Sequence, residues 1–483
     1  MPDIRLTIFI LGNLLIVLAI AMLIPAGIDW LNDDMDWRTF VLSAAITSGA
    51  GGAMVLGFRS PHAPALSARE GFILTTATWL VTAAFATLPL MLSTTALSFS
   101  GAYFETMSGL TTSGGTVITT LNVTPKGILL WRALLQWLGG VGIIAVAVAI
   151  LPLLRVGGMQ LFRMESSDKS EKIRPRVQQV VGLIILVYLA LTALCVLALM
   201  VAGMGTFDSI SHAMSAISTG GFSTKDASIA YYQNPAVEWV LTTFMALGGC
   251  TFVLLARAAL GDFKALWDDS QTRWYFGYMA AFSLVLALWQ IVMTGRGVAD
   301  SLRSSAFNVV SIATTTGFVS EDYTLWGSLP IAAIMVAFFI GGCTGSTSGA
   351  VKVFRFCVLG SVAIAQIRHL VHPNRMLLPT YNGKPISDDV IRSVLSFFFF
   401  YIGAFAILTI AISAFGLDLV TAMSGIAQAL GNVGPGLGPV IGPVGNYSTM
   451  PDGALWILSA AMLLGRLELL TVLVLFSPNF WRG

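Results

Sequence analysis

Charged side chains are scarce in this sequence. Lys, Arg, Asp and Glu make up 10% of the 483 residues, and 56% of the residues are hydrophobic. An average soluble domain is about 25% charged, so the composition excludes a soluble globular fold. The formal net charge is only +2, which gives no sign of the basic patch that nucleic-acid binding requires. No nucleic-acid partner is expected.

Cysteines and the motifs of enzymes and cofactor sites are also few. The four cysteines stand singly, without a CxxC pair or a zinc-ligand spacing, and we interpret them as packing residues. His369 and His372 are three residues apart but have no third ligand nearby. The glycine-rich stretch 431–445 lacks the GxGxxG spacing, and there is no P-loop motif. With no arrangement of nucleophile, base and oxyanion donors, we predict that the chain is not an enzyme and has no cofactor.

Long hydrophobic runs are abundant, and each has roughly the 20 residues that cross a hydrocarbon core about 30 Å thick. There are ten, at 7–27, 39–58, 72–94, 129–153, 178–203, 235–258, 274–294, 328–362, 391–415 and 453–476. We therefore predict an all-α polytopic membrane protein. The first run continues past Ala19 and Ala21 and a second run follows closely, which favours an uncleaved anchor over a signal peptide.

Basic residues occur in every second connection between these runs. Because Lys and Arg are retained on the cytoplasmic side, the connections that contain 59–69, 155–176, 257–273 and 352–392 are predicted to face the cytoplasm. The first connection on the opposite side instead carries Asp29, Asp33, Asp34 and Asp36 with the single base Arg38. Both chain termini are then cytoplasmic.

Four segments between the runs share one pattern when they are aligned on a glycine. The segments are YFETMSGLTTSGG around Gly114, SHAMSAISTGGF around Gly221, FNVVSIATTTGF around Gly317 and SGIAQALGNVGPG around Gly434. Six positions before these glycines stand Ser108, Ser215, Ser311 and Gln428. A second glycine landmark follows within the next run, at Gly139 and Gly140, Gly248 and Gly249, Gly341 and Gly342, and Gly465.

This repeat predicts four parallel units around one axis normal to the membrane, each consisting of a span, a short re-entrant helix, a polar loop and a second span. Inverted repeats would need neighbouring units of opposite orientation, which the basic residues do not indicate. The alternative is that Gly, Ser and Thr are only small residues at helix contacts. Scattered packing residues would not recur in register four times.

The four loops after the short helices carry hydroxyl, amide and backbone oxygens but no charged side chain. Their residues are Thr111, Thr112, Ser113 and Gly114; Ser218, Thr219, Gly220 and Gly221; Thr314, Thr315, Thr316 and Gly317; and Gly431, Asn432, Val433 and Gly434. Such oxygens replace the water of a monovalent cation without the full charge that would trap it. Glycine lets carbonyl groups turn inward, and the C-terminal ends of the short helices favour a cation. Glu105 and Asp208 are expected to satisfy loop donors or to attract cations at the outer mouth.

The four loops, which we expect to form a selectivity filter for a monovalent cation, resemble the filter loops of the TrkH branch of the Trk, Ktr and HKT superfamily of potassium transporters. The resemblance covers nearly the whole chain and includes WRALLQWLGGVGII, LPLLRVGGMQLFRMES, GGCTGSTSGAVKVFR and MLLGRLELLTVLVLF. It implies potassium uptake across the bacterial inner membrane, with K⁺ bound at the filter residues and with filter glycines that favour potassium. Ser113, Gly115 and Val433 differ from the pattern frequent in the family. The resemblance also implies a homodimer and a cytoplasmic nucleotide-binding regulatory subunit similar to TrkA, docking on 155–176 and 352–392.

The second span of the third unit is interrupted at 341–350 by a stretch too flexible and polar for continuous helix, with a simple helix kink as the alternative. In the family an intramembrane loop at this place gates the pore below the filter. By resemblance, the gate comprises Gly341, Gly342, Gly345, Ser346, Thr347, Ser348 and Gly349. Arg466 lies within the last span, where an arginine costs at least about 2.5 to 3.5 kcal/mol unless it has a partner or water. We hypothesise that Arg466 binds carbonyls of the gating loop and hinders cations until the loop shifts; the alternative is a pair with Glu468, which does not share its helix face.

These expectations divide the chain into two leading spans at 1–66 and pore units at 67–170, 171–265, 266–375 and 376–483. The main competing hypothesis is a sodium- or proton-coupled potassium symporter with a site at the membrane midplane. Proton coupling normally uses buried carboxylates, which are scarce here. A scaffold protein is a weaker alternative, because it needs no oxygen-lined pathway.

Overall fold

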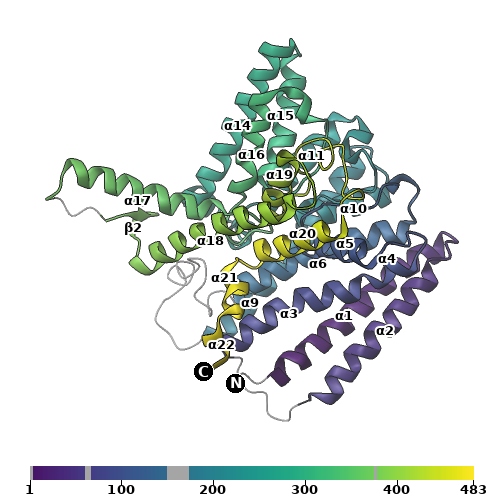
Figure 1. The fold of residues 1–483 in the computed structure, drawn as a ribbon. Helices are drawn as coiled ribbons and strands as arrows, with labels where there is room; N and C mark the ends of the chain where they lie inside the picture. The colour runs from purple at the N-terminus through teal and green to yellow at the C-terminus, as the bar shows by residue number, and fades with distance from the viewer. Residues whose placement is uncertain (1–3, 60–66, 150–172, 375–377, 483) are drawn as a thin grey trace.

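The computed structural model describes residues 4–59, 67–149, 173–374 and 378–482, and nearly all of the secondary structure in them is helical. Figure 1 shows the long helices lying side by side, with α17 and the adjoining hairpin extending away from the rest of the molecule. The hairpin pairs β1 (Thr380–Tyr381) with β2 (Lys384–Pro385) in antiparallel register. The prediction of an all-α polytopic membrane protein is confirmed.

Eight of the described helices are long and apolar enough to cross a membrane, and two bent pairs bring the possible number of spans to ten. The eight are α1 (Ile4–Leu31), α2 (Trp37–Gly57), α3 (Ala68–Ala86) continued by α4 (Leu88–Leu92), α6 (Lys126–Ala149), α9 (Ile173–Val201), α14 (Ser270–Thr294), α17 (Val353–Val371) and α18 (Asp388–Ser413). Shorter elements are α13 (Lys264–Asp268), α16 (Ser328–Ile340), α22 (Pro478–Arg482), η1 (Leu121–Val123), η2 (Ser228–Tyr232) and η3 (Tyr323–Trp326).

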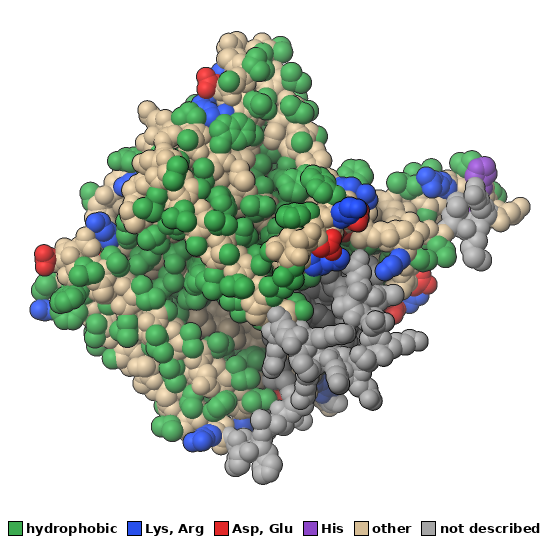
Figure 2. Space-filling view, turned by 180° about the vertical axis from the view of Figure 1, so that it is seen from behind, with side chains coloured by type: hydrophobic (Ala, Val, Ile, Leu, Met, Phe, Trp, Pro, Cys, Tyr) green, Lys and Arg blue, Asp and Glu red, His purple; other side chains and the backbone are tan. Residues whose placement is uncertain are grey.

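The surface of the bundle is mainly apolar. Figure 2 shows hydrophobic side chains spread over the middle of one face and charged side chains gathered toward its margins. On α18, for example, Ile402, Ile407 and Ile410 are exposed. A soluble protein does not present so much apolar surface to water, whereas lipid tails are a favourable neighbour for it.

Four short helices end directly before the four repeated loops. They are α5 (Phe99–Leu110), α10 (Thr206–Ile217), α15 (Val298–Ala313) and α19 (Leu419–Gly431). Polar caps start two of them: the Ser98 hydroxyl accepts from the Gly101 amide, and the Asp418 carboxylate accepts from the Thr421 amide. We call these four helices the pore helices. They lie where the repeat predicts re-entrant helices.

Two of the predicted spans are sharply bent. The run 235–258 forms α11 (Pro235–Gly248) and α12 (Phe252–Ala259) at 105° to each other. The run 453–476 forms α20 (Asp452–Arg466), then α21 (Leu470–Leu473) and η4 (Val474–Phe476), with a 106° bend. Hydropathy reports the length of an apolar segment but not its direction. The run 328–362 is divided into α16 and α17, with the break at the predicted interruption.

The two N-terminal helices brace the start of α6. Helix α1 packs along α2 and also contacts α3 and α6. Gly12 and Gly51 let the first two backbones meet, because a Cβ at either would lie 2.7 Å from the carbonyl oxygen of the other. Asp29, buried in α1, accepts a 2.5 Å hydrogen bond from the Gly127 amide in the first turn of α6. This contact helps to fix α6, which also carries Gln136, a hydrogen-bond partner of the second repeated loop.

The glycine landmarks of the second spans allow close packing against the pore helices. A Cβ there would crowd the carbonyl oxygen of the last or next-to-last pore-helix residue: Gly139 faces Leu110, Gly248 faces Ile217 and Gly465 faces Leu430. Small residues let helix backbones approach in this way. In units one, two and four these glycines therefore let the pore helix pack against its own second span, whereas Gly341 and Gly342 of unit three instead face Gly349, Ser348 and Gly249.

We expect Gly139→Ala to destabilise the protein by about 1–3 kcal/mol, because the added methyl group overpacks a backbone contact. Gly142→Ala is the matched control in the same helix, since its added Cβ would meet only Trp79, at 3.9 Å. Thermal unfolding of the purified variants in detergent measures the difference. Equal melting temperatures for the two variants would contradict the packing role.

Candidate functional site

The four repeated loops adopt one backbone conformation. Two residues before each glycine, φ is positive: 55° at Thr112, 52° at Thr219, 59° at Thr315 and 52° at Asn432. The glycines follow with φ of 89° at Gly114, 80° at Gly221, 84° at Gly317 and 109° at Gly434. A positive φ is unusual for a β-branched threonine and costs roughly 1–2 kcal/mol. Repetition of this strain at equivalent positions indicates that the surrounding structure holds each loop in one shape.

The four glycines form a closed ring. A Cβ added at each would crowd the carbonyl oxygen just before the glycine of the next unit: Gly114 faces Gly220, Gly221 faces Thr316, Gly317 faces Val433 and Gly434 faces Ser113. The order runs through units one, two, three and four and returns to one. The ring therefore brings four loops from widely separated parts of the chain around a common axis.

Each loop is fastened to its own pore helix in the same register. The amide before each glycine donates to the carbonyl six residues before that glycine, at 2.8–2.9 Å: Ser113 to Ser108, Gly220 to Ser215, Thr316 to Ser311 and Val433 to Gln428. These are the positions that the sequence alignment pairs. The alignment thus holds at the level of hydrogen bonds as well as of residue types.

Buried side-chain oxygens surround the ring. The Thr111 and Ser113 hydroxyls are 3.0 Å apart, and those of Thr314 and Thr316 are 2.7 Å apart. The Thr112 hydroxyl and the side-chain amide oxygen of Asn432 are buried and have no hydrogen-bond partner among the described residues. Oxygens of this kind can replace part of the hydration shell of a cation.

The electrostatics of the ring come from backbone dipoles. The pore helices end at the loops, so the partial negative charge of each C-terminus lies beside the ring. The acidic residues Glu105 and Asp208 accept hydrogen bonds from neighbouring donors. Glu105 accepts from Arg132 of α6 at 2.7 Å and from the Val117 amide at 2.8 Å, and Asp208 accepts from the Thr224 hydroxyl at 2.7 Å. Of the two roles considered for these carboxylates, the structure shows donor satisfaction.

The interruption between α16 and α17 is a buried loop that packs into the bend between α11 and α12. The Cys343 amide donates to the Gly249 carbonyl at 2.9 Å, and the Phe252 amide donates to the Gly345 carbonyl at 3.0 Å. The Thr251 hydroxyl donates to the Thr344 carbonyl at 2.8 Å. Irregular backbone at membrane depth needs such internal partners. The bend and the loop therefore satisfy each other's free backbone groups.

The same loop touches residues of the repeated loops, or the end of the preceding helix, in three units. Thr219 donates to the Thr347 hydroxyl at 3.1 Å, and the Gly349 amide donates to the Thr315 hydroxyl at 2.8 Å. The Ala350 amide donates to the carbonyl of Gly431, at the end of α19, at 2.9 Å. We call residues 341–350 the intramembrane loop. It lies directly against the ring, on the side where the pore helices end.

Arg466 reaches this loop from the last residue of α20. Its guanidinium donates to the Thr347 carbonyl at 2.7 Å, and the side chain is 3% exposed. Two of its nitrogens have no hydrogen-bond partner among the described residues. The alternative pairing with Glu468 is absent from the ion pairs of the described residues. A buried positive charge therefore stands beside Thr347, the residue that also contacts Thr219 of the second repeated loop.

Glu468 is paired with two cations that precede and begin α17. It forms an ion pair with Arg355, and its other oxygen lies 4.0 Å from the Lys352 amine. Arg355 also donates to the Val351 carbonyl at 2.7 Å and lies over the Phe397 ring at 3.8 Å. This cluster joins the bend of α20 and α21 to the end of the intramembrane loop.

We expect Arg355→Met to destabilise the protein by about 3–5 kcal/mol, because it leaves the buried Glu468 carboxylate with a weakened set of partners. The control is Arg257→Met, which breaks an exposed pair with Asp262 and is expected to cost about 0–1 kcal/mol. Thermal unfolding measures both. Equal melting temperatures for Arg355→Met and Arg257→Met would mean that the buried ion pair does not stabilise the fold. A higher melting temperature in the double variant Arg355→Met with Glu468→Leu than in Arg355→Met alone would support the stabilising role of the pair.

Several residues around the site were not assigned from the sequence. Gln136 of α6 donates to the Gly220 carbonyl at 2.5 Å and accepts from the Phe222 amide at 3.0 Å. Tyr278 of α14 donates to the Gly341 carbonyl at 2.6 Å and to the Ala313 carbonyl at 3.2 Å. Both are polar residues within apolar runs of the sequence, and a polar residue in such a run is the signal that could have identified them.

Part of the predicted docking region lies outside the described residues, namely Arg155, Arg163, Lys169, Lys172 and Arg375. His369 and His372 fall at the end of α17, and no group of three or more His, Cys, Asp or Glu residues able to hold a metal occurs in the described part of the chain.

The sequence matches the TrkH family, described as cation transport proteins, over residues 38–482. It is 42% identical over 475 residues to the Trk system potassium uptake protein TrkI of Halomonas elongata, covering 98% of this chain and 96% of TrkI. It is 37% identical over 481 residues to the Trk system potassium uptake protein TrkH of Escherichia coli, covering 98% of each chain. The fold is similar to the crystal structure of the potassium transporter TrkH from Vibrio parahaemolyticus, with a TM-score of 0.92, 34% identity and 100% of both chains covered.

Proposed function

Because this chain belongs to the TrkH family of cation transport proteins, whose members are transporters rather than enzymes, we propose that it takes up potassium through the ring of four glycines. The observation that carries the proposal is the closed cycle of glycine and carbonyl contacts from Gly114 to Gly434. Relatives named as potassium uptake proteins support the choice of ion. The ion binds the loop residues 111–114, 218–221, 314–317 and 432–434.

Selectivity in this proposal comes from backbone carbonyls and hydroxyls without formal charge. The side-chain oxygens of Thr112 and Asn432, which have no hydrogen-bond partner among the described residues, are further ligands in this proposal. The helix C-termini add a negative potential that attracts a cation and repels an anion. Because no carboxylate side chain belongs to the ring, a monovalent cation is held weakly enough to leave.

The intramembrane loop is the gate in this proposal. Its contacts with Thr219, Thr315 and Gly431 support a position across the path that leaves the ring. Arg466 holds the loop through Thr347 and adds a positive charge that opposes a cation. Opening requires that the loop move away from the ring and that the bond to Arg466 break.

The wider assembly follows the family resemblance. We propose a homodimer in a bacterial inner membrane, with both termini cytoplasmic and with a nucleotide-binding regulatory subunit similar to TrkA on the basic connections. The two leading spans then occupy 1–66 and the pore units 67–170, 171–265, 266–375 and 376–483. The exposed apolar faces of helices such as α18 are consistent with lipid or subunit contacts.

The test is cation flux into proteoliposomes that contain the purified chain, with and without the regulatory subunit. Rubidium or potassium entry that exceeds sodium entry supports the proposal. No cation flux in either condition would exclude it. The competing sodium- or proton-coupled symport is separated by imposing a sodium or pH gradient on rubidium entry at a fixed potassium gradient and membrane potential. A coupled carrier responds to the gradient of its driving ion, whereas a passive pore does not.

A further inference from the structure

A polar side chain on each pore helix holds the loop that leaves the filter. In three units this side chain stands nine positions before the filter glycine, at Glu105, His212 and Asn308. In the fourth unit that position is Gly425, and the neighbouring Ser424 makes the contact. The partner always lies two or three residues after the glycine. We call these four side chains the clasp residues.

In the first two units the clasp residues are a carboxylate and an imidazole. Glu105 accepts from the Thr116 hydroxyl at 2.9 Å and from the Val117 amide at 2.8 Å. His212 shares a 2.9 Å hydrogen bond with the Ser223 hydroxyl, and its other ring nitrogen bonds the Asp208 carbonyl at 2.7 Å.

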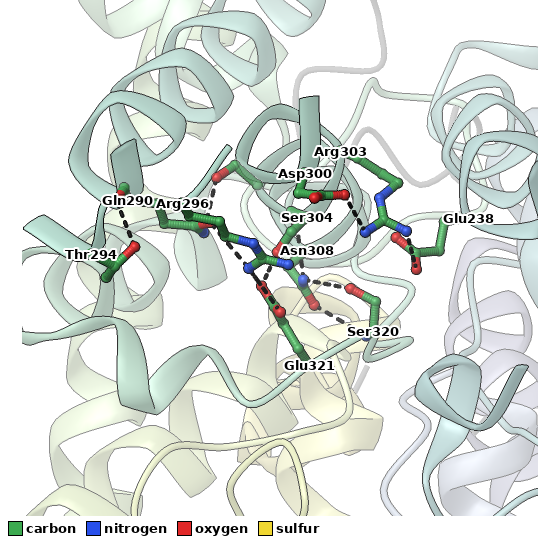
Figure 3. A network of polar contacts seen from close by, with 11 residues as sticks. Glu238, Gln290, Thr294, Arg296, Asp300, Arg303, Ser304, Asn308, Ser320 and Glu321 are labelled. Carbon is green, nitrogen blue, oxygen red and sulfur yellow. Dashed lines mark hydrogen bonds and ion pairs between the residues drawn. The ribbon is translucent and has the colours of Figure 1, made fainter. Parts of the chain in front are cut away.

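In the other two units the groups are an amide and a hydroxyl. Asn308 donates to the Ser320 hydroxyl at 2.8 Å and accepts from the Ser320 amide at 3.4 Å. Figure 3 shows Asn308 directed at Ser320, beside the network that joins Ser304, Arg296 and Glu321. Ser424 donates to the Leu437 carbonyl at 3.1 Å and accepts from the Leu437 amide at 2.9 Å.

All four clasp residues are buried, with exposed fractions of 0–1%. A buried polar group without a partner is costly, so each clasp stabilises one arrangement of its loop. Four different functional groups make the contact at nearly the same register. What the four units share is therefore a hydrogen bond that attaches the loop to its pore helix, and not one type of side chain. Arg132 extends the pattern, because it bonds both Glu105 and the Ser223 carbonyl of the second unit at 3.0 Å.

We propose that the clasp residues are positioning residues that set ion discrimination, an inference that rests on the proposed function. Each filter loop is fixed at its start by the end of its pore helix and at its finish by the clasp. The carbonyls of the ring lie between these two attachments. Release of the second attachment lets the ring adapt to a smaller or more strongly hydrated ion, which weakens selectivity that depends on the position of the oxygens.

The decisive experiment compares rubidium and sodium uptake by proteoliposomes that contain the full chain and its regulatory subunit. Asn308→Leu keeps the size of the side chain but removes both hydrogen bonds to Ser320, together with the 2.9 Å bond that Asn308 donates to the Ser304 carbonyl within the pore helix. We expect the ratio of rubidium to sodium uptake to fall about tenfold, the factor that corresponds to loss of a buried hydrogen bond. Ser424→Ala, a smaller change, is expected to lower the ratio about threefold. The matched control is Ser301→Ala, because Ser301 is buried in the same helix as Asn308 and has no hydrogen-bond partner for its hydroxyl among the described residues.

A role limited to folding predicts a different result. In that case Asn308→Leu and Ser424→Ala lower the yield or melting temperature while the uptake ratio stays that of Ser301→Ala, and the inference is overturned. If Asn308→Leu cannot be purified, Ser424→Ala and Ser320→Ala decide the question by the same ratio. Ser320→Ala added to Asn308→Leu is expected to change the ratio no further, because both act through one contact. Absence of rubidium uptake by the unmutated chain would refute the proposed function itself.

Discussion

Gly221→Ala is expected to reduce rubidium and potassium flux at least about a hundredfold. The backbone at Gly221 has φ of 80°, and an added Cβ would crowd the Thr316 carbonyl oxygen of the next unit. The positive φ alone costs an L-residue roughly 1–2 kcal/mol, and the methyl group must also displace a carbonyl of the ring. Tracer uptake into proteoliposomes measures the loss.

The matched control for Gly221→Ala is Gly277→Ala in α14, where an added Cβ has no neighbour within 4 Å. That variant is expected to retain unmutated flux, and it corrects for any general effect of the substitution. Retention of both flux and selectivity in Gly221→Ala would mean that the ring is not the ion path.

Arg466→Ala is expected to raise rubidium flux without the regulatory subunit at least about tenfold. The substitution removes the bond to the Thr347 carbonyl and a buried positive charge, which at low dielectric opposes a nearby cation by several kcal/mol. Folding should tolerate the change, because Arg466 has no ion-pair partner among the described residues and its removal leaves no carboxylate unpaired.

The control for Arg466→Ala is Arg257→Ala, which removes a positive charge from an exposed pair and is expected to leave basal flux unchanged. The measurement is the initial rate of tracer entry, normalised to the amount of reconstituted protein. An unchanged or lower rate in Arg466→Ala, with normal melting, would remove Arg466 from the gate and leave it a structural contact of the loop.

The repeat in the sequence contains much of the candidate site. Alignment on four glycines identifies the loops, and the structure shows the same register in the bonds from Ser113 to Ser108 and from Val433 to Gln428. Extension of that alignment by three positions would have revealed Glu105, His212 and Asn308 as equivalent polar residues. The sequence therefore predicts the clasp residues of the first three units. It does not predict that of the fourth unit, because Ser424 lies one residue before the equivalent position, which is Gly425.

Other features depend on long-range packing that composition does not encode. The bends after Gly248 and Arg466 place helix ends against the intramembrane loop, but an apolar run has the same hydropathy whether it is straight or bent. Helical spacing correctly disfavours an Arg466 pair with Glu468. Helical spacing cannot identify Arg355 as the partner of Glu468, because the two residues come together only when α17 packs against the bend between α20 and α21.

The most direct test of the account is the position of bound ions in an experimental structure of the protein with rubidium or thallium, located by anomalous scattering. We expect peaks on the axis enclosed by Gly114, Gly221, Gly317 and Gly434, next to the carbonyls of Ser113, Gly220, Thr316 and Val433. An ion on a path between other helices, with the ring empty under conditions that support flux, would contradict it.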